Sequence, residues 1–230
     1  MGVNFMGVNL PRMFTPVNIG SMSSQAPYHH GDLRNALIGA AAELAGQGGP
    51  DAVTIRAAAR KVGVTPTAAY RHFAGHEDLL TAAKDLSLDR MAVAMRNRLA
   101  ALAPDPDPAR SAMARLEAMG RGYVDFALSE PGLFRTAFCR NPDKALDLSA
   151  PDGPHTMLTK SVDDLIAVGF FREEARLGAE ISAWSLVHGL SMLLLDGPLA
   201  NLPVGEQQAA VDQTFDTFTR NFWSARVQGD

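Results

Sequence analysis

The 230-residue chain has a single cysteine, Cys139, which excludes an internal disulfide framework and any zinc site built from several cysteines. Charged residues make up 20% and aromatic residues 7% of the sequence, whereas 47% of the residues are apolar. Mean hydropathy is −0.03, so neither a disordered chain nor a membrane protein is expected. We expect a reduced, cytoplasmic protein with a packed core, large enough for one large domain or two small ones.

Long apolar runs are also missing. The longest such stretch near the C-terminus, Leu190–Leu195, is interrupted by Ser191 and is far shorter than the roughly 20 residues that cross a bilayer. The first 26 residues lack the basic start and apolar run of a signal peptide. They are rich in Gly, Pro, Asn and Ser, which predicts a disordered tail, and Met22 is a candidate natural start. We expect no contact with membranes.

The signatures of the common enzyme classes are absent from the sequence. It has no glycine-rich phosphate loop, nucleophile elbow or His-Glu-x-x-His run. His72 and His76 are four residues apart, but a turn between them breaks the shared helix face that a metal pair needs. Arg135 and Arg140 flank Cys139 and would lower its pKa, yet no partner base is identifiable. We therefore expect no enzymatic activity, no metal and no cofactor.

Apolar residues recur every three or four positions along most of the chain, and strand-like alternation is absent. Glycine and proline pairs, with threonine at the expected N-caps, mark the ends of the segments. The sequence predicts an all-α protein with helices at about 31–48, 55–62, 65–72, 76–102, 110–128, 132–139, 154–168, 173–195 and 206–225.

Charge is distributed unevenly. Residues 27–75 hold five basic and three acidic residues, a net charge of +2, whereas the whole chain carries −4. The first 26 residues add +1, so the remainder carries −7. A mildly basic unit on an acidic body suits a protein that touches a polyanion at one end.

Two short helices, Ile55–Val62 and Thr65–His72, are joined by Gly63 and Val64 in the spacing of a helix-turn-helix. The N-terminus of the second helix would offer N–H groups and a positive dipole end to phosphate. Small side chains at 67–69 would let this helix lie deep in the major groove. The alternative is a helical hairpin that only packs.

The wider run resembles the N-terminal domain of TetR-family regulators. The matching segments are YHHGDLR at 28–34, VTIRAAARKVGVTPTAAYRHF at 53–73 and EDLL at 77–80. Further along, WSLVHG at 184–189 resembles the Trp-x-x-x-His-Gly signature of one subclass of TetR C-terminal domains. The resemblance implies a homodimer with two DNA-binding heads and a helical effector domain, which usually represses transcription from a double-stranded operator.

Carried over by position, the resemblance places phosphate contacts at Thr54, Thr65 and Tyr70, and groove contacts at Thr67, Ala68, Arg71 and His72. The full DNA-binding set is Thr54, Thr65, Pro66, Thr67, Ala68, Tyr70, Arg71, His72 and His76. His76 stands where the family often has lysine, and a neutral imidazole would weaken that contact at pH 7. The arm at 28–30 either reaches the DNA or is a frayed lead-in.

The body contains aromatic and methionine stripes that suit either a plain core or the wall of an effector cavity. The candidate ligand-binding residues are Met119, Tyr123, Phe126, Phe134, Phe138, Trp184 and His188. Trp184 and His188 share a helix face, and we interpret them first as structural, with His188 bonded to a neighbouring helix. Polar groups are few, with His155 among them, which favours an apolar or amphipathic effector.

The last two helices are more apolar than one modest core requires. Pairing with a second copy in a four-helix interface would bury the excess, and the alternative is that both helices lie inside the protomer. The candidate interface residues are Leu186, Leu190, Phe215, Phe218 and Phe222.

The stiff segment 104–108, with three prolines, marks a boundary. We divide the chain into a tail (1–26), a helix-turn-helix domain (27–75), a connecting helix (76–103) and an effector-binding and dimerisation domain (104–230). The predicted function is a repressor that a small molecule releases from a palindromic operator. The alternative is a helical ligand-binding or interaction protein that has lost specific DNA binding.

Overall fold

The computed structural model describes residues 30–140 and 150–225. The predicted tail at 1–26 and the arm residues Tyr28 and His29 lie outside the described residues. The helices are α1 (His30–Gly48), α2 (Ile55–Val62), α3 (Pro66–Tyr70), α4 (His76–Ala100), α5 (Pro108–Ser129), α6 (Pro131–Phe138), α7 (Pro154–Ala167), α8 (Arg176–Leu195) and α9 (Val204–Ala225). Short 3₁₀ turns, η1 (Pro50–Ala52) and η2 (Glu173–Ala175), complete the described elements, which include no strand. The all-α prediction is confirmed.

Proline at the first turn positions four of these helices, because it needs no N–H partner there and its fixed φ suits a helix start. Pro66, Pro108, Pro131 and Pro154 begin α3, α5, α6 and α7. The Asp107 carboxylate accepts hydrogen bonds from the N–H groups of Ala109 and Arg110 and so caps α5.

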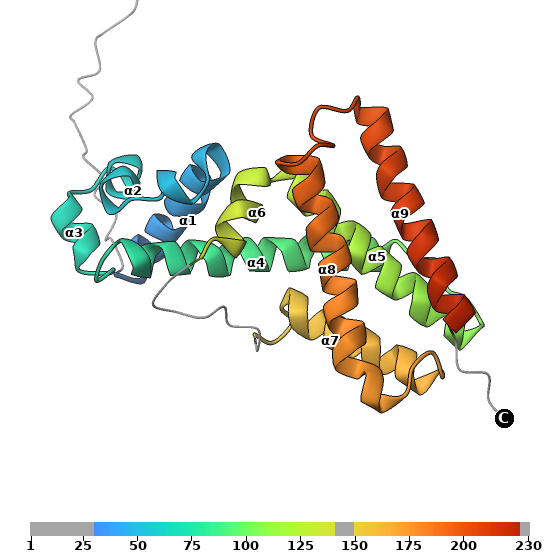
Figure 1. Cartoon of the computed structure of the whole chain (residues 1–230). Coiled ribbons are helices and arrows are strands. Elements are labelled where there is room, and N and C mark those ends of the chain that lie inside the picture. The colour runs from blue at the N-terminus through green and yellow to red at the C-terminus, as the bar shows by residue number, and fades with distance from the viewer. Residues whose placement is uncertain (1–29, 141–149, 226–230) are drawn as a thin grey trace, which may run out of the picture.

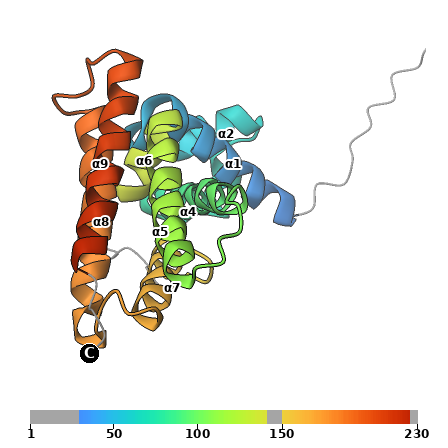
Figure 2. The ribbon, with the colours of Figure 1, turned by 90° about the vertical axis from the view of Figure 1, so that its right-hand side faces the viewer.

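Helix α4 joins the two parts of the molecule (Figure 1). Its first turns lie among α1, α2 and α3, and its remainder runs into the body formed by α5–α9. Helix α1 packs against α4 and also against α6, so the small N-terminal head contacts the body along two helices. Seen from the side, α8 and α9 form an outer layer of the body (Figure 2).

The contact between α1 and α6 is very close at Gly132. A Cβ atom at this position would collide with the carbonyl oxygen of Ala45 and approach that of Gly46 to 2.6 Å. Glycine therefore lets the start of α6 approach the last carbonyl groups of α1. This approach fixes the head on the body.

One helical stretch in the described part of the chain, Glu173–Leu195, is long and apolar enough to cross a membrane by length and composition alone. Core helices of other proteins pass the same test, and this segment is partly buried inside the protomer. Its exposed apolar face is described below.

Candidate nucleic-acid interface and ligand cavity

The turn between α2 and α3 is held by local caps. The hydroxyl oxygen of Thr54 accepts from the N–H of Ala57, and that of Thr65 accepts from the N–H of Ala68. Gly63 adopts the left-handed conformation with φ of 81°, which glycine tolerates without strain. Both threonines are exposed and keep a hydroxyl hydrogen free to donate outward.

Most of the predicted DNA-contact residues of α3 face outward. Thr65, Pro66, Thr67 and Arg71 are exposed, and Tyr70 is 52% exposed despite its large ring. Ala68 and His72 are half-buried. Ala69 is fully buried, so it packs the head and is not one of the small side chains that would face a groove.

Helix α3 is shorter than predicted, because it ends at Tyr70 instead of His72. The chain turns there, with the N–H groups of His72 and Phe73 both bonded to the carbonyl of Ala69. Phe73 is buried, and the guanidinium of Arg34 lies 4.9 Å from its ring centroid. Burial of this ring bends the chain away from the helix.

The charges of the head favour a polyanion at α2 and α3 more than at the start of α4. Arg56 and Arg60 are exposed on one face of α2, whereas Lys61 pairs with Glu43 at 2.8 Å. His76, the first residue of α4, lies 3.8 Å from the carboxylate of its exposed neighbour Glu77. A phosphate at this helix start would meet acidic side chains.

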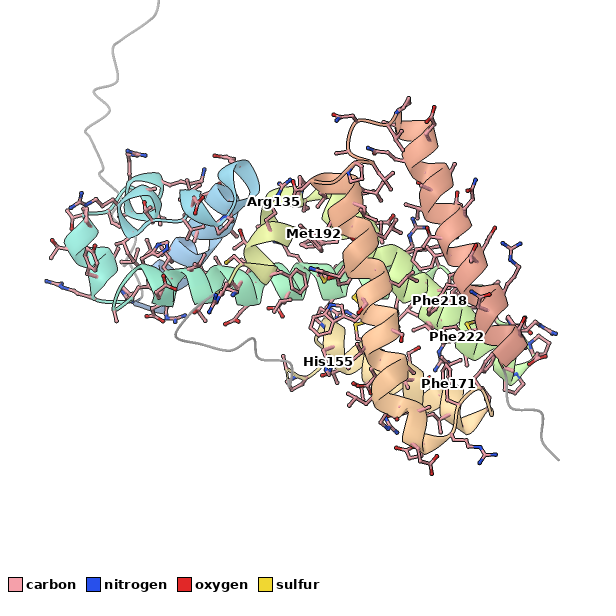
Figure 3. The ribbon with its side chains drawn as sticks, in the orientation of Figure 1. Arg135, His155, Phe171, Met192, Phe218 and Phe222 are labelled. Atoms are coloured by element: carbon pink, nitrogen blue, oxygen red, sulfur yellow. The ribbon has the colours of Figure 1, made fainter. Side chains whose placement is uncertain are left out.

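The body encloses a cavity of about 400 Å³ between α4, α5, α7, α8 and α9. Its walls are mainly apolar, with Met95, Leu116, Val187 and Phe218 among them. His155 and Trp184 lie on facing helices with ring centroids 6.1 Å apart. Figure 3 shows His155 beside α8 and Phe218 on α9. The volume lies within the range of small-molecule sites.

Four of the seven predicted ligand-binding residues line this cavity: Met119, Tyr123, Phe138 and Trp184. Phe134 and His188 instead line a second hollow of about 660 Å³, which the ends of α1 and α8 share with α6. Phe126 lines neither, because its side chain points into the core, so that prediction is wrong.

Tyr123 and His188 form the wall between the two hollows. The phenol oxygen of Tyr123 lies 2.8 Å from Nδ1 of His188. Burial raises the pKa of Tyr123 and lowers that of His188, so both groups are neutral near pH 7. His188 thus bonds to Tyr123 of the neighbouring helix α5, as expected from the sequence.

The second hollow lies between head and body. Arg135 of α6 pairs with Asp196 at the end of α8, with a shortest distance of 2.5 Å, and lowers the pKa of that carboxyl. Met192 lies near this pair (Figure 3). The hollow therefore borders the contact through which movement in the body would reach α1.

Sequence reasoning missed the cavity residues of α4, chiefly Thr81, Lys84 and Leu88. Lys84 is 8% exposed, which is unusual for lysine. A signal was present, because Lys84 falls on the apolar face of a helix whose other buried residues include Leu80 and Met91.

Two of the five predicted interface residues are buried in the protomer, and the other three are partly exposed. Leu190 and Phe215 are 6% and 2% exposed, so they cannot contact a second copy, and the prediction is wrong for them. Leu186 and Phe218 line the cavity. Phe222 packs against Phe171 and Phe218 at centroid distances of 5.1 and 4.1 Å (Figure 3).

A different apolar stripe faces outward from α8. It consists of Leu177, Ile181, Met192 and Leu193, which are 39–67% exposed. The exposed small residues Ser185 and Gly189 continue the stripe at helical spacing. Among the described residues, none covers this face of α8, which remains exposed in the protomer.

Burial raises the pKa of Cys139, contrary to the expectation that neighbouring arginines lower it. Within residues 30–140 and 150–225, no group of three or more His, Cys, Asp or Glu side chains could hold a metal ion. The geometry is that of an exposed helix-turn-helix joined by one long helix to a hollow body.

Comparison with known families gives two matches along the chain. The family described as "Bacterial regulatory proteins, tetR family" matches residues 37–83. The description "Tetracyclin repressor-like, C-terminal domain" matches residues 116–218. A curated relative, an uncharacterized HTH-type transcriptional regulator named YobS from Bacillus subtilis (strain 168), is 27% identical over 164 residues, which cover 71% of this chain and 80% of YobS.

Solved structures share the fold. A protein of unknown function from Rhodococcus sp. RHA1 has a TM-score of 0.67 and 25% identity, covering 88% of this chain and 99% of its own. A TetR variant from Acinetobacter baumannii AYE, solved in complex with minocycline, has a TM-score of 0.62 and 20% identity. The match covers 87% of this chain and 99% of the variant's chain.

Proposed function

Because this chain belongs to the TetR family of helix-turn-helix transcriptional regulators, which are not enzymes, we propose that it represses transcription from a palindromic operator and that a small apolar or amphipathic molecule releases it. The observation that carries the proposal is the exposed surface of α3. Thr65, Thr67, Tyr70 and Arg71 are exposed and present hydroxyl and guanidinium groups there. The protein would act in the cytoplasm, where the operator is.

The contacts with DNA follow from these positions. The hydroxyl groups of Thr54, Thr65 and Tyr70 would donate to phosphates, as would the N–H groups at the start of α3. Thr67, Ala68 and Arg71 would face base edges, with His72 beside them and Pro66 against the backbone. Because few of these side chains are long, much of the specificity would come from the shape of the DNA.

Helix α4 supports a ligand response, because one element belongs to both sites. It begins at the head and provides cavity residues from Thr81 to Met95. A ligand that moved α4 would change the spacing of two recognition helices away from about 34 Å, the length of one DNA turn. The complex of the TetR variant with minocycline shows that a protein of this fold can bind a small molecule, which supports the proposed ligand response.

The protein would work as a homodimer, since a palindrome has two half-sites. The outward stripe of α8, with Leu177, Ile181, Gly189 and Met192, is the surface we propose for the partner. Contact of this apolar stripe with water is unfavourable. Pairing of α8 and α9 with the same two helices of a second protomer would remove the stripe from water.

The direct test is selection of random duplex DNA by the purified full chain at two salt concentrations. A palindromic motif of roughly 15–25 base pairs, with half-sites one turn apart, is expected. Recovery of no motif, together with binding that vanishes as salt rises, would reduce DNA to a nonspecific partner.

That negative result would favour the second candidate function, a ligand-binding or interaction protein without specific DNA binding. The acidic neighbours of His76 and the small net charge of the head are the observations behind it. The same cavity would then be the site of the main activity.

A further inference from the structure

One wall of the cavity carries the side chain of a buried lysine. Lys84 of α4 is 8% exposed and lines the cavity. Its Nζ donates to the main-chain carbonyl of Cys139 over 2.5 Å. Within the part of the chain that the structure describes, no ion pair includes Lys84.

The carbonyl satisfies this lysine only in part. Cys139 directly follows α6 and has an extended backbone, so its carbonyl is a neutral acceptor. An ammonium has three N–H donors and a full positive charge, and buried charges are normally paired. The bond to this carbonyl therefore accounts for one donor, and among the described residues no carboxylate forms an ion pair with Lys84.

The polar surroundings of Lys84 include a second donor. Thr81 also lines the cavity and lies three residues before Lys84, on the same face of α4. Its hydroxyl and the lysine ammonium could hold the two oxygens of one carboxylate. Both groups lie toward the end of α4 that enters the head.

The other end of the cavity is apolar. Met95 lies eleven residues beyond Lys84 on α4, which corresponds to about 16 Å along a helix. Leu116, Met119 and Phe215 line the cavity with it. An elongated molecule with one polar end therefore matches the walls.

Two carboxylates also reach this cavity and limit the charge of the ligand. Asp85 and Asp89 line it, but both are exposed, so water stabilises their charge without a ligand. They would repel a second negative group. They would also attract a cation, which makes an amine the competing ligand class.

Building on the proposed ligand response, we propose that the effector is an amphipathic monoanion, with an apolar body along Met95 and Leu116 and a single carboxylate on the ammonium of Lys84. The carboxylate accepts from the lysine donors that remain beside the bond from Lys84 to the Cys139 carbonyl, so both groups share one ammonium. Because that bond joins α4 to α6, and α6 lies against α1 at Gly132, binding acts on the contact between body and head.

The test uses three probes with one alkyl chain and different ends: dodecanoate, dodecanol and dodecylamine. Each is titrated into the full chain by calorimetry, below its micelle concentration. Dodecanoate is expected to bind about tenfold or more tighter than dodecanol, as for a hydrogen bond to a charged group. The Lys84→Gln variant should lose this preference and Lys84→Arg should keep it. The control Arg90→Gln, which removes a positive charge from an exposed position of α4 outside the cavity lining, should keep it as well.

Equal binding of acid and alcohol, or tighter binding of the amine, would overturn the anion assignment while leaving the cavity as a ligand site. Binding of none of the three would overturn it as well, and would also remove support for the ligand response. The comparison of probes on the unmodified chain does not depend on any variant folding. The DNA selection above is independent of all these outcomes.

Discussion

Tyr70 presents a large ring to solvent at the end of α3, with 52% of its surface exposed. Its hydroxyl is thus accessible to a phosphate of bound DNA. Removal of the hydroxyl alone, in Tyr70→Phe, should weaken binding to the selected duplex by about 1.5–3 kcal/mol, because a hydrogen bond to a charged phosphate is lost. Fluorescence anisotropy with labelled duplex measures the change.

The loss should be similar for the selected and an unrelated duplex, since a phosphate contact has no base preference. The substitution should leave thermal unfolding unchanged. Unaltered affinity for both duplexes would contradict the assigned docking of α3.

His188 lies in the wall between the two hollows, and its burial predicts a pH dependence of stability. Its pKa is lowered in the folded chain below the ordinary value of 6.5, so the unfolded chain binds a proton more readily. The free energy of unfolding should therefore be unaffected by this group above pH 6.5 and fall as the pH drops through the folded pKa. Urea unfolding at a series of pH values measures it.

The variant His188→Asn should lose that part of the dependence, because asparagine does not titrate. If the free energy of unfolding fell equally in the wild type and the variant as the pH dropped, His188 would be ruled out as the source.

At the scale of elements, the contact of α6 with α1 depends on the absence of a side chain at Gly132. A Cβ there would meet backbone oxygen atoms of Ala45 and Gly46, which cannot move aside as a flexible side chain would. Gly132→Ala should lower the free energy of unfolding by about 1–3 kcal/mol, as overpacking does. Urea denaturation gives this value.

Gly46→Ala is the matched control, since the same substitution is made in the partner helix of the same contact. Its Cβ would meet nothing within 4 Å, so it should be neutral or stabilising by up to about 1 kcal/mol. Equal destabilisation by both substitutions would contradict the close approach of α6 to α1 at Gly132.

The helices could be predicted from sequence because their ends carry explicit signals. Pro66, Pro108 and Pro131 begin helices, and Gly63 and the Gly48–Gly49 pair end them. The error at α3 arose where no such signal exists. Burial of Phe73 ends that helix, and burial is a tertiary property.

The faces of α8 and α9 could not be predicted in the same way. Phe215, Phe218 and Phe222 recur at helical spacing, but a core, a cavity wall and an interface all use such residues. The guanidinium carbon of Arg121 lies 4.8 Å from the ring centroid of Phe215. Phe215 therefore faces inward because α9 packs on α5, and the sequence alone does not determine that packing. The outward face of α8 was missed because small residues interrupt it.

At the scale of the whole molecule, the outer layer of α8 and α9 predicts the assembly state. Gly189 faces outward, and a Cβ there would meet nothing within 4 Å in the protomer. A glycine inside a helix is unfavourable by about 1 kcal/mol relative to alanine, so close approach of a partner helix would explain its presence. Gly189→Arg should weaken the dimer by about thirtyfold, the scale of an interface hot spot.

Light scattering across a dilution series measures that change. Asn97→Arg, which adds the same charge at an exposed position of α4, is the control and should leave the dimer intact. A wild-type chain that remained monomeric at all concentrations, or a Gly189→Arg dimer of unchanged strength, would contradict the proposed interface.

The central claim is sequence-specific recognition of DNA by paired heads. The most direct measurement is the affinity of the full chain for the selected duplex and for one of equal length and base composition with both half-sites scrambled. We predict that the selected duplex binds about a thousandfold or more tightly at physiological salt, as is typical of specific regulators. Equal affinity for the two duplexes would contradict the claim and leave a ligand-binding protein with a nonspecific head.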